Sequence, residues 1–209
     1  MLTTTRLVHH DFEMTHEEFE DRKAWPEYWP IDSKVDFTGD YASQSPVGNM
    51  HIGTRGGGAA GTGRYLALRG VNSDQFYVEA TPRWYRPRAA LDLRDTRAAL
   101  YLKAITPLTV NEGYQPYLFI DDYCGETQSY CGWYVNQPLR VGTTWTFNEL
   151  DLLNDESLWV RYSHQRPLDT VLSQVGFIGL MCLCGTKFHG VGAKGILGLD
   201  EFRYHIPLP

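Results

Sequence analysis

The stretch GILGLDEFRY, residues 195–204, has the alternating pattern of a β-strand. Leu197 and Leu199 alternate with glycine, and two aromatic residues follow at the same spacing. A period of two is typical of a strand that buries one face, whereas a helix would repeat every three or four residues. Asp200 and Glu201 interrupt this pattern with two adjacent carboxylates. The strand therefore raises the question of what two acidic residues do near its centre.

Similar short patterns recur along the chain, separated mostly by turns that contain Gly, Pro, Asn or Asp. The predicted strands cover residues 64–70, 75–81, 98–105, 116–123, 132–141, 144–152, 158–164, 175–184 and 196–206. Helical periodicity is limited to residues 15–25 and 166–175, and residues 33–63 have a loop-like composition. So many strands with so little helix predict an all-β, two-sheet antiparallel β-sandwich. Because there is no repeat or linker-like boundary, residues 1–209 are expected to form a single β-sandwich domain.

Composition narrows the classes of partner. The net charge of −6 comes without a basic cluster, which argues against a nucleic-acid partner. No apolar stretch is long enough to span a membrane, so no membrane span is expected. Residues 1–23 lack the apolar core of a signal peptide, which leaves the compartment open: either the protein is intracellular, or it is extracellular and its leader is absent from this sequence.

The sequence has no catalytic or nucleotide-binding motif in its usual structural context. The stretch GGGAAG at 56–61 matches a dinucleotide fingerprint in letters, but no strand is predicted before it and no helix after it, so it is expected to be a surface loop. There is no G-x-S-x-G or H-E-x-x-H motif, and no histidine pair has metal-ligand spacing. Cys124 and Cys131 flank a predicted hairpin tip, so a local disulfide and two separate thiols both remain open.

Aromatic residues gather with charged residues in three stretches, RWYRPR at 83–88, GYQPYLFIDDY at 113–123 and YCGWY at 130–134. An aromatic ring covers the C–H face of a sugar, and planar polar side chains bond its hydroxyl groups. The candidate ligand-binding residues are Trp84, Tyr85, Arg88, Tyr117, Asp121 and Trp133. The arginines would suit an acidic polysaccharide, because guanidinium binds carboxylate or sulfate bidentately.

Other interpretations of these rings stay open. About half of them are expected in the core, since each strand of a sandwich buries one face. Trp145, Trp159 and Phe177 are assigned to the core. Tryptophan, tyrosine and arginine also anchor protein partners, so the same stretches could form an interface.

The order of these elements resembles the galactose-binding-domain-like jelly rolls, which include many carbohydrate-binding modules of polysaccharide-degrading enzymes. The resemblance runs from DFE at 11–13 and WPEYW at 25–29 to the closing strand. Between them lie the stretches GTGRYLAL at 61–68, LDLRDTRAALYLKA at 91–104, WTFNELDLLNDESLW at 145–159 and VGFIGL at 175–180. It implies a jelly-roll sandwich in which the first and last strands lie close together.

The resemblance also implies an explanation for Asp200. Members of that superfamily commonly hold a structural calcium ion where the first and last strands meet, and the matching residues here are Glu13 and Asp200. Calcium takes six to eight oxygen ligands, which backbone carbonyls could complete.

The function implied by the resemblance is a non-catalytic carbohydrate-binding domain that recognises a polysaccharide or oligosaccharide. Two alternatives stay open because a fold does not determine function. One is a structural or assembly protein, such as a phage or surface-filament component, for which self-association would be expected. The other is a polysaccharide lyase or glycosidase on a similar sandwich.

Overall fold

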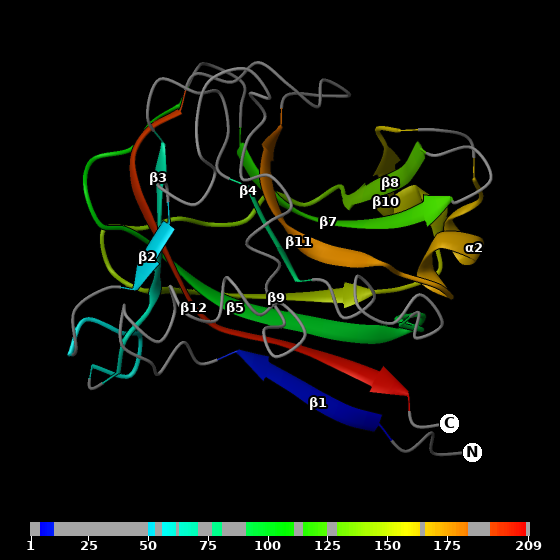
Figure 1. Ribbon diagram of the computed structural model, residues 1–209, viewed down its shortest axis with the longest axis horizontal. Helices are drawn as coiled ribbons and strands as arrows, with labels where there is room; N and C mark the ends of the chain where they lie inside the picture. Colours follow the sequence, from blue (N-terminus) through cyan, green and yellow to red (C-terminus); the bar gives the residue numbers. More distant parts are fainter. Residues whose placement is uncertain are drawn as a thin grey trace.

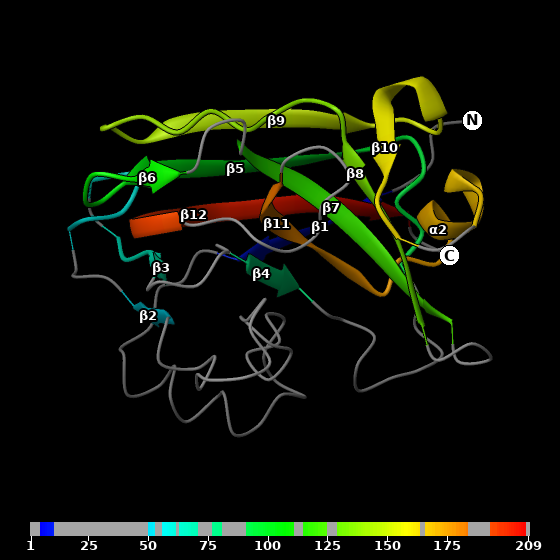
Figure 2. The ribbon, with the colours of Figure 1, turned by 90° about the horizontal axis from the view of Figure 1, so that it is seen from above.

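The structure is a computed structural model, and it describes residues 5–10, 50–52, 56–61, 63–70, 77–80, 91–110, 115–124, 129–163, 166–183 and 193–207. Two antiparallel sheets face each other and enclose the hydrophobic core (Figure 1). The strands of the second sheet cross over those of the first at an angle (Figure 2). The predicted β-sandwich is therefore confirmed.

The first sheet has the strand order β2-β3-β12-β5-β9, and β1 and β6 also pair with β12. Its strands are β1 (Thr5–His10), β2 (Met50–Ile52), β3 (Leu66–Gly70), β5 (Thr96–Ala104), β6 (Thr109–Val110), β9 (Thr146–Leu152) and β12 (Ala193–Pro207). Burial alternates along β5 and β9 as the sequence pattern predicts, because the inward residues are mostly apolar and the outward ones mostly charged or polar.

The second sheet has the order β10-β8-β7-β11-β4. Its strands are β4 (Tyr77–Ala80), β7 (Gln115–Cys124), β8 (Ser129–Val135), β10 (Trp159–Arg161) and β11 (Phe177–Leu183). A 3-10 turn, η3 (Glu156–Leu158), precedes β10, and the short helix α2 (Leu168–Leu172) packs against β7 and β8. In the described part of the chain, no helix has the length and apolar character needed to cross a membrane.

The strand β12 organises the first sheet. One of its edges pairs with β5, and the other is shared end to end by β3, at residues 195–199, and β1, at residues 202–207. The first and last described strands are thus neighbours, as expected (Figure 1). The register with β5 shifts between Asp200 and Arg203, where Glu201 has a φ of 51°. This is a β-bulge, which inserts one extra residue and bends the strand.

The side chain of Asn148 holds a neighbouring segment of the chain along the edge of β9. The buried Asn148 accepts a hydrogen bond from the Arg140 backbone N–H at 2.7 Å and donates one to the Arg140 carbonyl at 3.0 Å. Its amide therefore fixes the segment around Arg140 along β9. A covered edge is less able to pair with another chain.

Three strands, β1, β2 and β6, were not predicted from the sequence, and β2 lies inside the stretch expected to be a loop. The strand predicted at 132–141 ends at Val135 in the structure. The helix predicted at 15–25 falls outside the described residues. The helix predicted at 166–175 is present as the shorter α2.

Cys131 lies in the core, where its side chain is 3% exposed. In the register of β7 and β8, Cys131 is opposite Asp122, whereas Cys124 is opposite Ser129. The local disulfide between Cys124 and Cys131 stays a prediction.

Candidate functional site

The outer face of the second sheet carries a group of aromatic side chains. Along β7, Leu118 and Ile120 point into the core, so the alternating residues Tyr117, Phe119 and Asp121 point away from it. We call Tyr117, Phe119, Tyr134 and Tyr162 the outer-face aromatic cluster. It joins residues from β7, β8 and the segment that follows β10.

The rings of this cluster are neighbours. The ring centroids of Tyr117 and Tyr134 are 4.9 Å apart, and those of Tyr134 and Tyr162 are 6.3 Å apart. Phe119 meets Tyr162 edge-on at 6.4 Å. Phe119 and Tyr134 are buried, whereas Tyr117 and Tyr162 are only partly buried. The partly exposed rings therefore rest on buried ones, which is the arrangement needed for a firm apolar surface.

Asp121 lies beside this cluster and is 2% exposed. Its Oδ2 accepts a hydrogen bond of 2.6 Å from the Tyr162 hydroxyl, and its Oδ1 has no hydrogen-bond partner. Burial raises the pKa of Asp121 to about 7; the charge of Asp122 also raises it, and the Tyr162 hydroxyl opposes the rise. This carboxyl group thus titrates near neutral pH.

Gly132 creates the space for this contact. It lies opposite Asp121 in the register of β7 and β8, and its carbonyl accepts a hydrogen bond from the Tyr162 backbone N–H at 3.1 Å. A Cβ atom at this position would overlap both the Asp121 carboxylate and the Tyr162 ring. The absence of a side chain at Gly132 is what lets the ring reach the carboxylate.

Asp122, the next residue in sequence, points to the opposite face of the sheet from Asp121, toward the core. It is 1% exposed and forms an ion pair with Arg166, whose carbonyl accepts a hydrogen bond of 3.2 Å from Trp133 Nε1. Trp133 itself is 5% exposed and belongs to the main core. The prediction that Trp133 contacts a ligand is at odds with this position, because its ring faces the opposite side of the sheet from the outer-face aromatic cluster.

The predicted ligand-binding residues therefore separate into three groups. Tyr117 and Asp121 share the outer face of the second sheet. Trp133 lies beneath that sheet, in the core. Trp84, Tyr85 and Arg88 fall outside the described residues, so their part in a site stays a prediction.

Three members of the cluster, Phe119, Tyr134 and Tyr162, were not among the sequence candidates. Tyr134 follows Trp133 by one residue, and the alternation of β8 places it on the opposite face. Tyr162 comes just after β10, where the period of two from Val160 indicates the outer face. Alternation along β7 places Phe119 on the same face as Tyr117, whereas the other two residues belong to different segments.

Asp200 has a structural role that explains an acidic residue in the last strand. It is 3% exposed, and its Oδ2 accepts a hydrogen bond of 2.7 Å from the Ala59 backbone N–H. Its Oδ1 accepts one of 2.8 Å from the Glu201 N–H, at the bulge. Gly58 leaves no room for a Cβ atom beside this carboxylate. Asp200 thus holds the glycine-rich loop, residues 56–61, against the first sheet.

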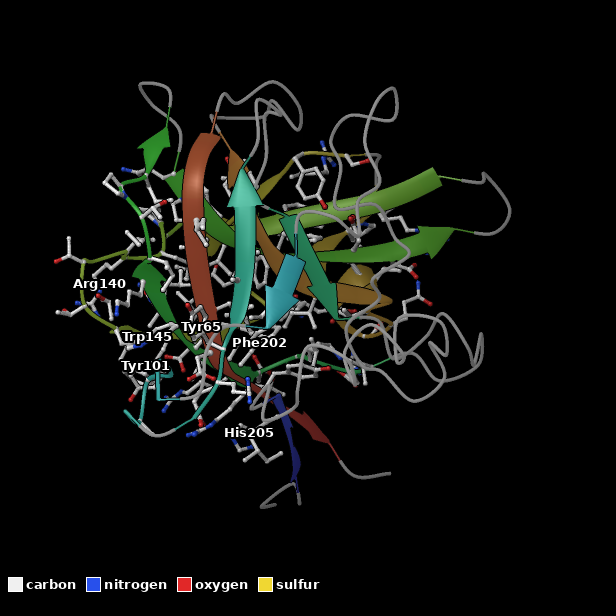
Figure 3. The ribbon with its side chains drawn as sticks, turned by 60° about the vertical axis from the view of Figure 1, so that its left-hand side comes forward. Tyr65, Tyr101, Arg140, Trp145, Phe202 and His205 are labelled. Atoms are coloured by element: carbon white, nitrogen blue, oxygen red, sulfur yellow. The ribbon has the colours of Figure 1, made fainter. Side chains whose placement is uncertain are left out.

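Trp145 also contacts the glycine-rich loop. Trp145 Nε1 donates a hydrogen bond of 2.8 Å to the Gly57 carbonyl, and its ring meets Tyr65 edge-on at 5.4 Å (Figure 3). Trp145 is only partly buried and lies against Gly198 on the outer face of the first sheet. Its assignment to the core is therefore wrong, whereas Trp159, 4% exposed, is confirmed as a core residue.

Of the two residues expected to bind calcium, Asp200 lies within the described part of the chain and Glu13 falls outside it. Within the described ranges, no group of three or more His, Cys, Asp or Glu side chains is arranged to hold a metal ion. The oxygens of Asp200 already accept N–H bonds, so a cation would share them.

Comparison with known proteins gives a fold but no sequence family. No family model and no curated protein sequence matches this chain. The solved structures that resemble it include the CBM22-1 and GH10 modules of xylanase 10B from Clostridium thermocellum, in complex with xylohexaose. That likeness has a TM-score of 0.50 at 10% identity and covers 94% of this chain and 28% of that one.

Two further matches are separate carbohydrate-binding modules. One is the family 11 module from Clostridium thermocellum with a β-1,3-1,4-mixed-linked tetrasaccharide, with a TM-score of 0.46 at 10% identity, covering 68% of this chain and 76% of that one. The other is CBM27-1 from Caldicellulosiruptor saccharolyticus with mannohexaose, with a TM-score of 0.38 at 8% identity, covering 95% and 96%. In fold, the chain resembles part of the xylanase 10B fragment.

Proposed function

We propose that this protein is a non-catalytic carbohydrate-binding domain that binds a polysaccharide over the outer-face aromatic cluster. The observation that carries this proposal is the cluster itself, with partly exposed tyrosines supported by buried rings on one sheet face. The likeness to the xylanase 10B fragment supports the fold but does not identify a ligand.

The chemistry of the exposed rings suits a sugar chain. Tyr117 and Tyr162 present apolar ring faces, and the Tyr117 hydroxyl can bond sugar hydroxyls, whereas the Tyr162 hydroxyl is bonded to Asp121. Both rings lie against the buried Tyr134 ring, so neighbouring sugar rings could contact Tyr117 and Tyr162. The finer proposal of an acidic polysaccharide rests on Arg88 and its neighbours, which lie outside the described residues.

Replacing Tyr117 with alanine should weaken glycan binding about tenfold, because it removes one stacking ring and its hydroxyl. Calorimetry against mixed-linked β-glucan, xylan, mannan and polygalacturonate would measure this for any polysaccharide that the unmodified protein binds. Phe147→Ala is the matched control, since Phe147 is 41% exposed on the first sheet. Equal losses in both variants would contradict the proposed face.

The same panel separates the alternative functions. Binding without product release supports the proposal, whereas cleavage of the polysaccharide would favour the lyase or glycosidase. No binding to any polysaccharide, together with self-association by light scattering, would favour the structural protein.

We also propose that Glu13 and Asp200 bind a structural calcium ion. Asp200 lies on β12 beside the end of β1, and β1 ends at His10, opposite Phe202. Glu13 follows His10 closely enough in sequence to reach that junction. The ion would join the two terminal strands of the first sheet.

Removal of calcium with EGTA should lower the melting temperature, because a ligand that binds only the folded state stabilises it. Differential scanning calorimetry with and without EGTA measures the shift. Glu13→Gln should abolish the EGTA effect and leave the Asp200 contact with the glycine-rich loop in place. An unchanged melting curve, with no calcium found by elemental analysis, would refute the site.

A further inference from the structure

Asp121 combines two properties that a purely structural residue rarely shows together. It is 2% exposed, and one of its carboxylate oxygens, Oδ1, has no hydrogen-bond partner. Burying a carboxylate without full hydrogen bonding is costly, so such a group calls for a role. The other oxygen is bonded to the hydroxyl of Tyr162, a partly exposed member of the outer-face aromatic cluster.

The Tyr162 ring is held at both of its ends. At the backbone end, its N–H donates to the Gly132 carbonyl at 3.1 Å. At the hydroxyl end, it donates to Asp121 at 2.6 Å. Because Gly132 has no side chain, the ring can lie over β8 and reach Asp121 on the neighbouring β7. The hydroxyl anchor is the one that depends on a titratable group.

We propose that Asp121 is a positioning residue that fixes the Tyr162 ring in the glycan-binding face, and that its gain of a proton loosens the ring and weakens binding. This inference rests on the proposed function. It makes carbohydrate binding by this protein dependent on pH through a side chain that the sugar does not touch.

The surroundings of Asp121 place this change in the neutral range. Burial raises its pKa to about 7, and the charge of Asp122, which is paired with Arg166 on the other face, adds to the rise. On β8, the residue opposite Asp121 is Gly132, which has no side chain. On the side of Asp121 that faces β11, the Gly176 N–H donates a hydrogen bond to the Asp121 carbonyl. Among the described residues, Tyr162 is the one ionisable group that contacts the carboxylate, and no cation pairs with it.

The two protonation states predict opposite trends for affinity and stability. The ionised carboxylate accepts a charge-assisted hydrogen bond, which is stronger than a neutral one, so affinity should rise with pH. Stability should move the other way, because the pKa of Asp121 in the folded state is raised above its ordinary value of 3.8. Below pH 3.8 the carboxyl group is protonated in both the folded and the unfolded protein, so its burial carries no ionisation penalty. The free energy of unfolding should fall as the pH rises from 3.8 to about 7.

Asp121→Asn tests the inference because it removes the charge and keeps the shape. Using the polysaccharide of the panel that binds best, the unmodified protein should lose about fivefold in affinity between about pH 8 and about pH 5.5. At the higher pH, the variant should bind about fivefold more weakly than the unmodified protein and melt at a higher temperature, with affinity nearly independent of pH. Asp151→Asn, on the exposed face of β9, is the matched control and should retain the original pH profile.

Two results would overturn the inference. One is an Asp121→Asn variant with the affinity and pH profile of the unmodified protein; the other is a loss of affinity accompanied by a lower melting temperature, which would indicate general damage to the fold.

A direct test of the ring separates this inference from the proposed function. In protein with carbon-labelled tyrosine, the NMR ring signal that disappears in Tyr162→Phe should shift with a midpoint near pH 7, and this shift should be absent in Asp121→Asn. If the protein binds no polysaccharide but the signal titrates, the proposed function fails and the positioning role stands. A signal that does not titrate refutes the positioning role even if polysaccharide binds.

Discussion

Replacing Trp133 with alanine should lower the free energy of unfolding by about 3–5 kcal/mol, the range typical of a large aromatic residue removed from a core. Trp133 is 5% exposed, belongs to the main core and bonds the Arg166 carbonyl through its indole N–H. The truncation would leave a cavity beneath the second sheet and remove the hydrogen bond to the Arg166 carbonyl. Urea denaturation followed by circular dichroism measures the loss.

Trp145→Ala provides the comparison for this prediction. Trp145 is partly buried on the outer face of the first sheet, so its removal should cost less, about 1–2 kcal/mol. The Trp133→Ala variant, in conditions where it remains folded, should bind glycan with an affinity close to that of the unmodified protein, because Trp133 lies in the core. A large loss of affinity without a loss of stability would restore Trp133 as a ligand-binding residue.

Replacing Gly132 with alanine should lower the free energy of unfolding by about 2–3 kcal/mol, at the upper end of the range for overpacking. The new methyl group would occupy the place of the Asp121 carboxylate and the Tyr162 ring, so one of them must move. Glycan binding should weaken at the same time, since the Tyr162 ring would leave the outer-face aromatic cluster.

A double variant shows whether the overlap with the ring is the cause. If it is, Gly132→Ala combined with Tyr162→Ala should be less damaging than the sum of the two single changes. Denaturant unfolding of the four proteins gives the coupling energy. Strictly additive losses would mean that the Gly132 effect does not act through Tyr162.

The strands with clear alternation were predictable because their burial follows their own sequence. In β5, Ala98, Leu100 and Leu102 face the core, and the structure places them as the pattern predicts. By contrast, β1 has the sequence TRLVHH, with little alternation, and is a strand because β12 offers it an edge. A strand that depends on its partner leaves little trace in its own residues.

The candidate site was only partly predictable, for a related reason. Along β8, apolar or aromatic residues occupy both faces, with Trp133 on one and Tyr134 on the other. Alternation shows that these rings diverge, but it cannot show which one faces the core. The contact of Tyr162 with Asp121 is still less visible, because it joins residues far apart in the sequence across a glycine of a third segment.

The position of β12 has a consequence for how the chain folds as it is synthesised. The strands β1, β3, β5 and β6 all pair with β12, which follows every one of them in the sequence. A nascent chain would therefore leave the ribosome with the edges of these strands that face β12 unpaired, while β7 and β8 could already form their hairpin. Closing the first sheet must wait for residues 193–207, and such long-range closure is slow. Until then the exposed strand edges could pair with other chains, so release of those residues should be the step most dependent on chaperones.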